Sequence, residues 1–267
     1  MRDVEVQQVT VDGRRIAYRR SGTGPTVLLL HGGVSDGREW LPLMTDVGAD
    51  ADLVSLDLPG CGGSDDPPPS CTLADLADDV AGVVRALDLG PVHLGGLSFG
   101  GGLALQVAIR HPVVVRSLLL FSAYAGWAGS LPPEEVAARR AWARTFLAGS
   151  RPTDPADLVP GLLGSRLPPE LADLLGQVAA AARPGPTMCL LEAFADADLS
   201  ADLVDVRCPT LVVHGERDER APRAVADALH RGIPGSRLVV LPGVGHMVNL
   251  EARAETAALV RDVVSRQ

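Results

Sequence analysis

The stretch LGGLSFGGGLAL, from Leu94 to Leu105, places one serine among five glycines. Each glycine lowers the stability of a helix or strand interior by about 0.5–1 kcal/mol relative to alanine, so five of them need a structural reason. One reason is a flexible loop. The other is a strained turn between a strand and a helix, for which Gly96 to Gly100 has the pattern G-x-S-x-G with Ser98 at its centre.

The segments on either side of Ser98 favour the strained turn. The pattern predicts a strand over Val92–Leu97 and a helix over Phe99–Arg110. Strand and helix nearly collide at such a turn, which requires small residues two positions before and after the serine. The serine then lies at a helix N-terminus, where backbone N–H groups stabilise a developing negative charge. We therefore predict that Ser98 is a nucleophile.

Predicted strands alternate with predicted helices along the chain. Val4–Val11 and Arg14–Arg19 flank an Asp12-Gly13 turn and indicate an antiparallel hairpin. Continuous apolar runs indicate strands buried on both faces, as in parallel sheets. The further strands are Thr26–Leu30, Leu53–Leu56, Val92–Leu97, Ser117–Phe121, Thr210–Val213 and Arg237–Leu241, and the helices are Arg38–Val47, Thr72–Leu87, Phe99–Arg110, Pro222–His230 and Val248–Val264. The pattern predicts an α/β fold with a mostly parallel, doubly wound sheet.

The middle of the chain has a different composition. Residues 125–204 are rich in alanine and proline, with helical patterns such as Pro133–Leu147 and Pro169–Ala182 and no good strand. A helical insertion between two strands of a sheet indicates a cap. We therefore assign residues 1–124 and 205–267 to an α/β core and residues 125–204 to a helical cap.

Composition excludes several classes of function. All 24 cationic side chains are arginine, so Schiff-base and P-loop chemistry, which use lysine, are excluded. A net charge of −9 without a basic run argues against binding to nucleic acid. The apolar runs near the start are too short to span a bilayer, and no signal-peptide core is present, so we expect a cytoplasmic protein without a membrane partner. Four cysteines show no metal-binding spacing; we expect them reduced, Cys61 being the most exposed, and expect no metal or cofactor.

A serine is a weak nucleophile at neutral pH and needs a base that is itself oriented by an acid. We expect His246 to be the base, because it follows the last predicted strand in a glycine-containing loop that can bring the ring towards Ser98. His214 is expected to support the loop after its strand. Three further histidines are expected to be structural or to face solvent, namely His93, His111 and His230.

The acid is expected at another strand end, between the serine and the histidine in the sequence. Asp218 closes the segment His214–Asp218 after a predicted strand and is the first candidate. Glu216 is the second candidate and Glu219 the third. No acidic residue directly follows the predicted strand Ser117–Phe121. The alternative position for the acid, at the end of that strand, is therefore empty.

Acyl transfer also needs two N–H donors for the oxyanion. We expect one from Phe99, directly after the serine, and the other from Gly33, in the turn His31-Gly32-Gly33, with Val34 as the next choice. Contacts with the substrate are expected at His31, Val34, Leu97, Trp127, Trp142 and Val248.

The predicted cap carries apolar and basic side chains with two interpretations each. The apolar side chains either line a pocket over Ser98 or form a small core of the cap itself. The basic side chains lie on one helical segment. They either face water, as charge runs usually do, or bind a substrate carboxylate. The apolar set is Trp127, Trp142, Phe146, Met188 and Phe194, and the basic set is Arg139, Arg140 and Arg144.

With Ser98, Asp218 and His246 in this order, nearly the whole chain resembles an α/β-hydrolase-fold enzyme. The resemblance includes the His31-Gly32-Gly33 turn and the loop Asp57–Ser64. The parts outside the cap are most similar to the lactonase and esterase branch that contains 3-oxoadipate enol-lactonases. A serine at the turn argues against haloalkane dehalogenases and epoxide hydrolases, which resemble this fold but use aspartate there.

The resemblance and the residues together imply a serine hydrolase that cleaves a small-molecule carboxylic ester or lactone through an acyl-enzyme. Two alternatives remain open. The same residues could serve C–C bond hydrolysis, thioester release or cyclisation in a biosynthetic pathway, or the fold could serve as a ligand-binding receptor. The expected partner is a small-molecule substrate, and the expected assembly is a monomer or homodimer.

Overall fold

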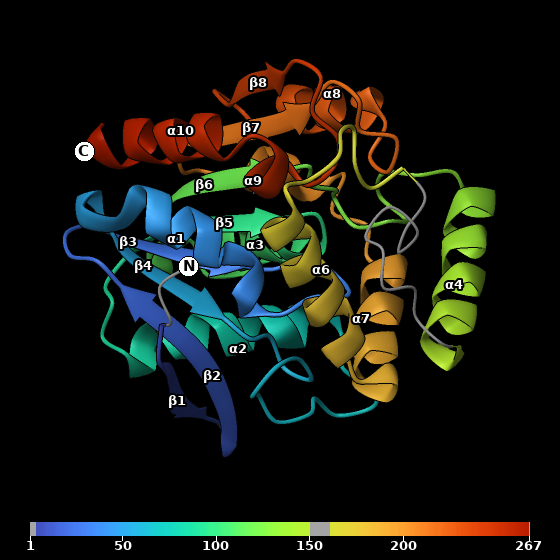
Figure 1. The fold of residues 1–267 in the computed structure, drawn as a ribbon, viewed down its shortest axis with the longest axis horizontal. Coiled ribbons are helices and arrows are strands. Elements are labelled where there is room, and N and C mark those ends of the chain that lie inside the picture. Colours follow the sequence, from blue (N-terminus) through green and yellow to red (C-terminus); the bar gives the residue numbers. More distant parts are fainter. Residues whose placement is uncertain (1–3, 150–160, 267) are drawn as a thin grey trace.

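The computed structural model describes residues 4–149 and 161–266, and its centre is one sheet (Figure 1). The strand order is β1-β2-β4-β3-β5-β6-β7-β8. β1 and β2 form the predicted antiparallel hairpin, β2 pairs antiparallel with β4, and the strands from β4 to β8 are parallel. The strands are β1 (Val6–Val11), β2 (Arg14–Ser21), β3 (Thr26–Leu30), β4 (Asp52–Leu56), β5 (Val92–Leu97), β6 (Val115–Phe121), β7 (Thr210–Gly215) and β8 (Arg237–Leu241). The predicted fold class is confirmed.

Helices cover both faces of the sheet (Figure 1). α2 and α3 pack together on one face, and α1 packs with α10 on the other. Thr72 caps α2, because its hydroxyl accepts the Asp75 N–H while the Asp75 carboxylate accepts the Thr72 N–H. The α-helices outside the middle segment are α1 (Leu41–Val47), α2 (Leu73–Ala86), α3 (Phe99–Arg110), α8 (Arg223–Gly232), α9 (Val248–Glu251) and α10 (Arg253–Ser265), and the 3₁₀ turns are η1 (Gly37–Trp40), η2 (Gly48–Asp50), η3 (Pro112–Val114) and η4 (Asp202–Asp205).

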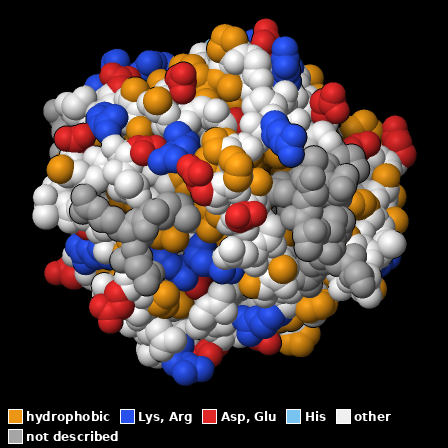
Figure 2. Space-filling model, viewed as in Figure 1, with side chains coloured by type: hydrophobic (Ala, Val, Ile, Leu, Met, Phe, Trp, Pro, Cys, Tyr) orange, Lys and Arg blue, Asp and Glu red, His pale blue; other side chains and the backbone are white. Residues whose placement is uncertain are grey.

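The apolar runs explain why the sheet is buried on both faces. Along β3, Leu28 and Leu30 belong to one hydrophobic cluster, and Val27 and Leu29 belong to another. Successive side chains of a strand point to opposite faces, so one continuous apolar run supplies both cores. No helix among the described residues is long and apolar enough to cross a membrane. On the face shown in Figure 2, charged side chains of both signs are interspersed with small groups of apolar side chains.

The chain order places a switch point at the centre of the sheet. β4 lies on one side of β3 and β5 on the other, so the connections after β3 and β5 leave in opposite directions. Ligands of open parallel sheets bind outside the carboxyl ends of the strands at such a point. Gly32 and Gly33 follow β3, and Ser98 follows β5. The fold therefore brings the glycine-rich turn and the serine to one crevice.

Between β6 and β7 the described residues contain helices and no strand. α4 (Pro133–Ala148), α6 (Pro169–Ala181) and α7 (Pro184–Asp196) lie at one end of the sheet, and α4 and α7 pack together (Figure 1). Part of the predicted cap, residues 150–160, lies outside the described residues. The division into core and cap stays a prediction.

Two local expectations are wrong. The predicted helix Val248–Val264 is broken at Ala252, whose backbone (φ −127°, ψ 54°) is not helical, into α9 and α10. Cys61 is buried, with 3% of its surface exposed, because the loop after β4 turns inward; the Cys61 N–H donates to the carbonyl oxygen of Leu58 at 2.8 Å. Burial raises the pKa of the Cys61 thiol.

Candidate active site

Ser98 occupies a strained turn between β5 and α3. Its backbone has φ 55° and ψ −110°, a conformation that few non-glycine residues adopt. The Ser98 N–H donates to the carbonyl oxygen of Phe121 at 2.8 Å, which ties the turn to the end of β6. Such strain costs about 1–3 kcal/mol and persists only where the surroundings hold it in place. The flexible-loop alternative is therefore wrong.

Close contacts explain the glycines around the serine. A Cβ atom on Gly96 would lie 2.2 Å from the carbonyl oxygen of Gly100, and one on Gly100 would lie 2.2 Å from that of Leu30. A Cβ atom on Gly101 would lie 2.5 Å from that of Ala123. Neither the backbone atoms nor the short side chain of Ala123 can move away far enough, so none of these three positions accepts a side chain.

Gly102 is a glycine for another reason. A Cβ atom there would lie 2.4 Å from Cε2 of Phe194 and 2.8 Å from the carbonyl oxygen of Tyr124. Phe194 belongs to α7, and its ring also lies 5.0 Å from that of Phe99, between ring centroids. The missing side chain at Gly102 therefore lets the middle segment pack directly on the turn that carries the serine.

Asp218 and His246 meet behind the cavity that Ser98 lines. The Nδ1–H of His246 donates to Oδ2 of Asp218 at 2.8 Å, which leaves Nε2 of His246 as an acceptor. Oδ1 of Asp218 accepts the N–H groups of Arg220 (2.9 Å) and Ala221 (2.8 Å). Burial alone would raise the pKa of Asp218, but His246 and the Ala221 N–H hold that pKa below its usual value. The carboxylate is thus kept ionised beside the imidazole.

The other acidic candidates point elsewhere. Glu216 is exposed and accepts the Gly243 N–H at 2.8 Å, which braces the loop before His246, and Glu219 is also exposed. His214 is buried, with Nδ1 3.8 Å from Oδ2 of Asp218. Burial lowers the pKa of His214, so this ring packs beside the carboxylate as a neutral group.

One cavity gathers the predicted nucleophile, the predicted base and the predicted oxyanion donors. Ser98, His246, Gly33 and Phe99 all line it. The space open to water in it is about 90 Å³, which is room for several water molecules and suits a small ligand. Among the residues that the structure describes, no group of three or more His, Cys, Asp or Glu side chains is placed to hold a metal ion.

Residues 27–259 match the model of the alpha/beta hydrolase family. The chain belongs to this family. It is 30% identical over 261 residues to the 2-(acetamidomethylene)succinate hydrolase of Mesorhizobium japonicum, covering 93% of this chain and 89% of that one. It is 33% identical over 247 residues to a pimeloyl-[acyl-carrier protein] methyl ester esterase of Neisseria meningitidis, covering 89% and 92%.

A solved structure agrees with this assignment. The thermophilic esterase of Thermogutta terrifontis superposes with a TM-score of 0.86 and 28% identity over 98% of both chains. The predicted resemblance to this superfamily and to its branch of lactonases and esterases is confirmed, and the relatives are hydrolases. We therefore describe the chain as a hydrolase of the alpha/beta hydrolase family.

The structure places most of the predicted substrate contacts of this hydrolase at the cavity. Val34, Leu97, Trp127 and Trp142 line it. Phe146 and Phe194 line it too, whereas Met188 lies in a surface groove near Cys71. Trp127 and Phe194 also pack on each other, with ring centroids 5.8 Å apart, so these two residues belong to a small core and to the cavity wall at once.

Two predicted contacts do not line the cavity. Val248 is fully buried in α9, in the hydrophobic cluster that also holds Leu250. His31 is fully buried: its Nδ1–H donates to the Gly32 carbonyl oxygen (2.7 Å), and its Nε2 accepts the Leu58 N–H (3.1 Å). Burial lowers the pKa of His31, so the neutral ring links the turn after β3 to the loop after β4.

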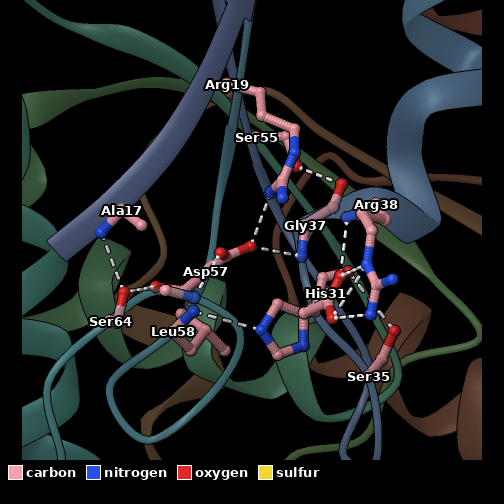
Figure 3. A network of polar contacts seen from close by, with 12 residues as sticks. Ala17, Arg19, His31, Ser35, Gly37, Arg38, Ser55, Asp57, Leu58 and Ser64 are labelled. Carbon is pink, nitrogen blue, oxygen red and sulfur yellow. Dashed lines mark hydrogen bonds and ion pairs between the residues drawn. The ribbon is translucent and has the colours of Figure 1, made fainter. Parts of the chain in front are cut away.

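A buried ion pair supports the same turn (Figure 3). Asp57 is fully buried, and its Oδ1 accepts hydrogen bonds from Nη1 of Arg19 and from the Gly37 N–H, both at 2.8 Å. Its Oδ2 accepts the Gly63 N–H at 2.9 Å. A buried charge is tolerated when it is paired and its lone pairs are filled, as here. The network joins β2, the end of β4 and η1.

The sequence patterns missed Glu39, Tyr124 and Arg220, all of which line the cavity. Glu39 is 3% exposed, and its Oε2 accepts the Gly32 N–H at 3.4 Å. Burial raises the pKa of Glu39 to about 7. Charged residues in short polar turns are usually exposed, so the sequence held no signal for this burial.

The three predicted cap arginines separate in the structure. Arg139 faces the cavity, with its guanidinium bonded to Glu135 and to the Tyr124 hydroxyl. Arg140 and Arg144 instead form ion pairs on α7. Their partners are Glu192 and Asp196.

Proposed function

We propose that this hydrolase cleaves a small-molecule carboxylic ester or lactone through an acyl-enzyme on Ser98. The observation that carries the proposal is the pairing of His246 with Asp218 at 2.8 Å, beside a cavity that His246 shares with the strained Ser98. A serine at such a turn, a histidine with a free Nε2 and an ionised carboxylate behind it are the parts that nucleophilic acyl transfer requires.

The reaction then has two halves. Oγ of Ser98 attacks the carbonyl carbon while Nε2 of His246 takes the hydroxyl proton, and the carbonyl oxygen becomes an oxyanion. When the tetrahedral intermediate collapses, His246 gives the proton to the leaving alkoxide, and the alcohol departs. A water molecule attacks the acyl-enzyme, its proton passes to His246 and then to Oγ of Ser98, and the carboxylic acid is released. In a lactone, the alcohol and the acid remain in one molecule.

The backbone at the cavity supports the oxyanion step. Phe99 is the first residue of α3, so its N–H has no partner within the helix. A Cβ atom on Gly33 would lie 3.7 Å from that of Phe99, so the turn after β3 adjoins the start of α3. We expect the N–H groups of these two residues to hold the oxyanion, each being worth about 10²–10³ in rate.

A fluorophosphonate probe tests the proposal, because it phosphonylates activated serines. We expect the wild type to be labelled at Ser98 and the folded Ser98→Ala variant to remain unlabelled. The wild type should also hydrolyse simple nitrophenyl esters. Labelling without activity on those esters would favour the other chemistries of the same site, and a folded wild type that is not labelled would contradict the proposal.

A further inference from the structure

Arg220 projects from a rigidly held backbone. Its N–H donates to Oδ1 of Asp218 at 2.9 Å. Its carbonyl oxygen accepts hydrogen bonds from Nη2 of Arg139, at 2.6 Å, and from the hydroxyl of Tyr124. The acid that orients His246 therefore also fixes the position from which the Arg220 side chain starts.

The guanidinium of Arg220 lies on the cavity wall. Its central carbon is 5.6 Å from the centroid of the Trp142 ring, and both residues line the cavity that holds Ser98. A guanidinium over an aromatic ring keeps its N–H groups free at its edge. The side chain is thus oriented by stacking and still able to donate hydrogen bonds.

Arg220 has no carboxylate partner within ion-pair distance in residues 4–149 and 161–266. The neighbouring arginine in the cavity wall, Arg139, is by contrast paired with Glu135, with Nε and Oε1 2.9 Å apart. Burial, and then the charge of Arg139, lower the pKa of Arg220 from its ordinary value. The guanidinium is therefore partly desolvated, and no carboxylate of the described residues lies within ion-pair distance to offset the loss of water.

The cavity has little negative charge of its own. Glu39 is the one carboxylate side chain among the described residues that line it, and burial raises its pKa to about 7. Asp218 does not line the cavity, and its carboxylate is hydrogen-bonded to His246. Because Arg139 is paired with Glu135, Arg220 is the source of the excess positive charge that the described residues place on the cavity wall.

We propose that Arg220 binds a carboxylate of the substrate, so that the ester or lactone cleaved at Ser98 carries a free carboxylate at its other end. This inference rests on the proposed function. A guanidinium matches a carboxylate with two parallel hydrogen bonds, and pairing supplies the opposite charge that the described residues do not place within ion-pair distance. An additional alcohol or alkyl group at the same place would leave the cation unpaired.

Two esters of similar length test the proposal. Monomethyl adipate carries the carboxylate, and methyl hexanoate lacks it. We expect the wild type to show a kcat/KM for monomethyl adipate about 10- to 100-fold above that for methyl hexanoate, the range that hydrogen bonds to a charged group provide. Arg220→Gln should reduce this ratio towards one, mainly through the KM for monomethyl adipate, and Arg220→Lys should restore part of it. The ratio cancels any loss common to both esters.

Arg217→Gln is the matched control. Arg217 lies in the same loop, is exposed and does not line the cavity. This variant removes the same charge from the protein and should keep the wild-type ratio. Equal ratios in the wild type and Arg220→Gln, or an equal fall in both variants, would overturn the proposal while leaving the hydrolase function intact.

A binding measurement separates the two proposals. Adipate should slow fluorophosphonate labelling of Ser98 in the wild type and have little effect in Arg220→Gln. Equal protection in both proteins overturns the role of Arg220. If the folded wild type is not labelled and cleaves no ester, the proposed function fails, and titration calorimetry with adipate decides the role of Arg220. Binding by the wild type alone supports that role, and equal or absent binding overturns it.

Discussion

The imidazole of His246 and the carboxylate of Asp218 form one hydrogen bond of 2.8 Å, with 4% and 7% of the two residues exposed. At such a buried position a charge-assisted hydrogen bond is strong and holds the imidazole ring in one orientation and one tautomer. Asp218→Asn keeps the shape of the side chain. Its amide oxygen should stay with the Arg220 and Ala221 N–H groups, which places the NH2 group, a donor, at Nδ1 of His246. We expect kcat to fall about 10³–10⁴-fold, as for a base in the wrong tautomer, in steady-state assays with a nitrophenyl ester.

Glu216→Gln is the control for that substitution. Glu216 was the second candidate for the acid, yet its side chain is exposed and bonds to the Gly243 N–H. We expect its kcat to stay within about threefold of the wild type, since surface changes of this kind cost little. A larger loss in Glu216→Gln than in Asp218→Asn would reverse the assignment of the acid.

The backbone at Ser98 predicts an effect on stability that is independent of chemistry. At φ 55° and ψ −110° alanine is strained as serine is, whereas glycine is not. Ser98→Gly should therefore be more stable than Ser98→Ala by about 1 kcal/mol, although glycine gains more entropy on unfolding. Urea denaturation of the two inactive variants measures the difference. A less stable glycine variant would show that the turn holds no such strain.

Glu39 predicts a pH dependence of stability. Burial raises its pKa to about 7 from the ordinary value of 4.5, so the stability it contributes is present below pH 4.5 and is lost as the pH rises through 7. Glu39→Gln removes this loss. From pH 5 to pH 8, the free energy of unfolding of Glu39→Gln should therefore rise by about 2–3 kcal/mol relative to that of the wild type.

The comparison between the two proteins isolates Glu39. Asp36, whose charge helps to raise the pKa of Glu39, is paired with Arg38 and remains ionised over this range. Its contribution is therefore shared by both proteins and cancels. Denaturation at several pH values provides the test, and a difference that does not change with pH would exclude a buried, titrating Glu39.

Gly102 predicts a packing defect. Gly102→Ala would place a Cβ atom 2.4 Å from Cε2 of Phe194, and we expect a loss of about 1–3 kcal/mol in stability from this overpacking. Phe194→Leu removes the ring atoms concerned. In that background the cost of Gly102→Ala should be smaller, which a double-mutant cycle by urea denaturation measures. Additive effects of the two substitutions would contradict the contact.

Most of the sheet was predictable from the sequence, because the parallel strands contain apolar runs, such as Val27–Leu30 and Leu118–Phe121, that are followed by turn-forming or polar residues. The break at Ala252 was not, since the apolar pattern continues from α9 into α10. That break matters for the site. Val248 follows His246 by two residues and was expected at the cavity, but α9 turns its side chain into the core.

The candidate site was predictable where backbone geometry dictates the residue type. Glycines two positions from Ser98, and an acid and a histidine after the last strands, follow from the turn and from the parallel sheet. Glu39 and Arg220 were not predictable, because the sequence of a polar loop does not reveal which charged side chains the fold will bury. Gly102 had no account from the sequence either, since its neighbour Phe194 comes from a helix about 90 residues away.

The covalent intermediate is the most direct test of the central claim that Ser98 is the acylated nucleophile. A nitrophenyl ester is mixed with excess enzyme, the reaction is quenched in acid within the first turnover, and the digested protein is analysed by mass spectrometry. We predict one acyl group on the peptide that contains Ser98, formed with a burst of nitrophenol and absent in Ser98→Ala. Acylation of another residue, or turnover by Ser98→Ala at the wild-type rate, would contradict the account.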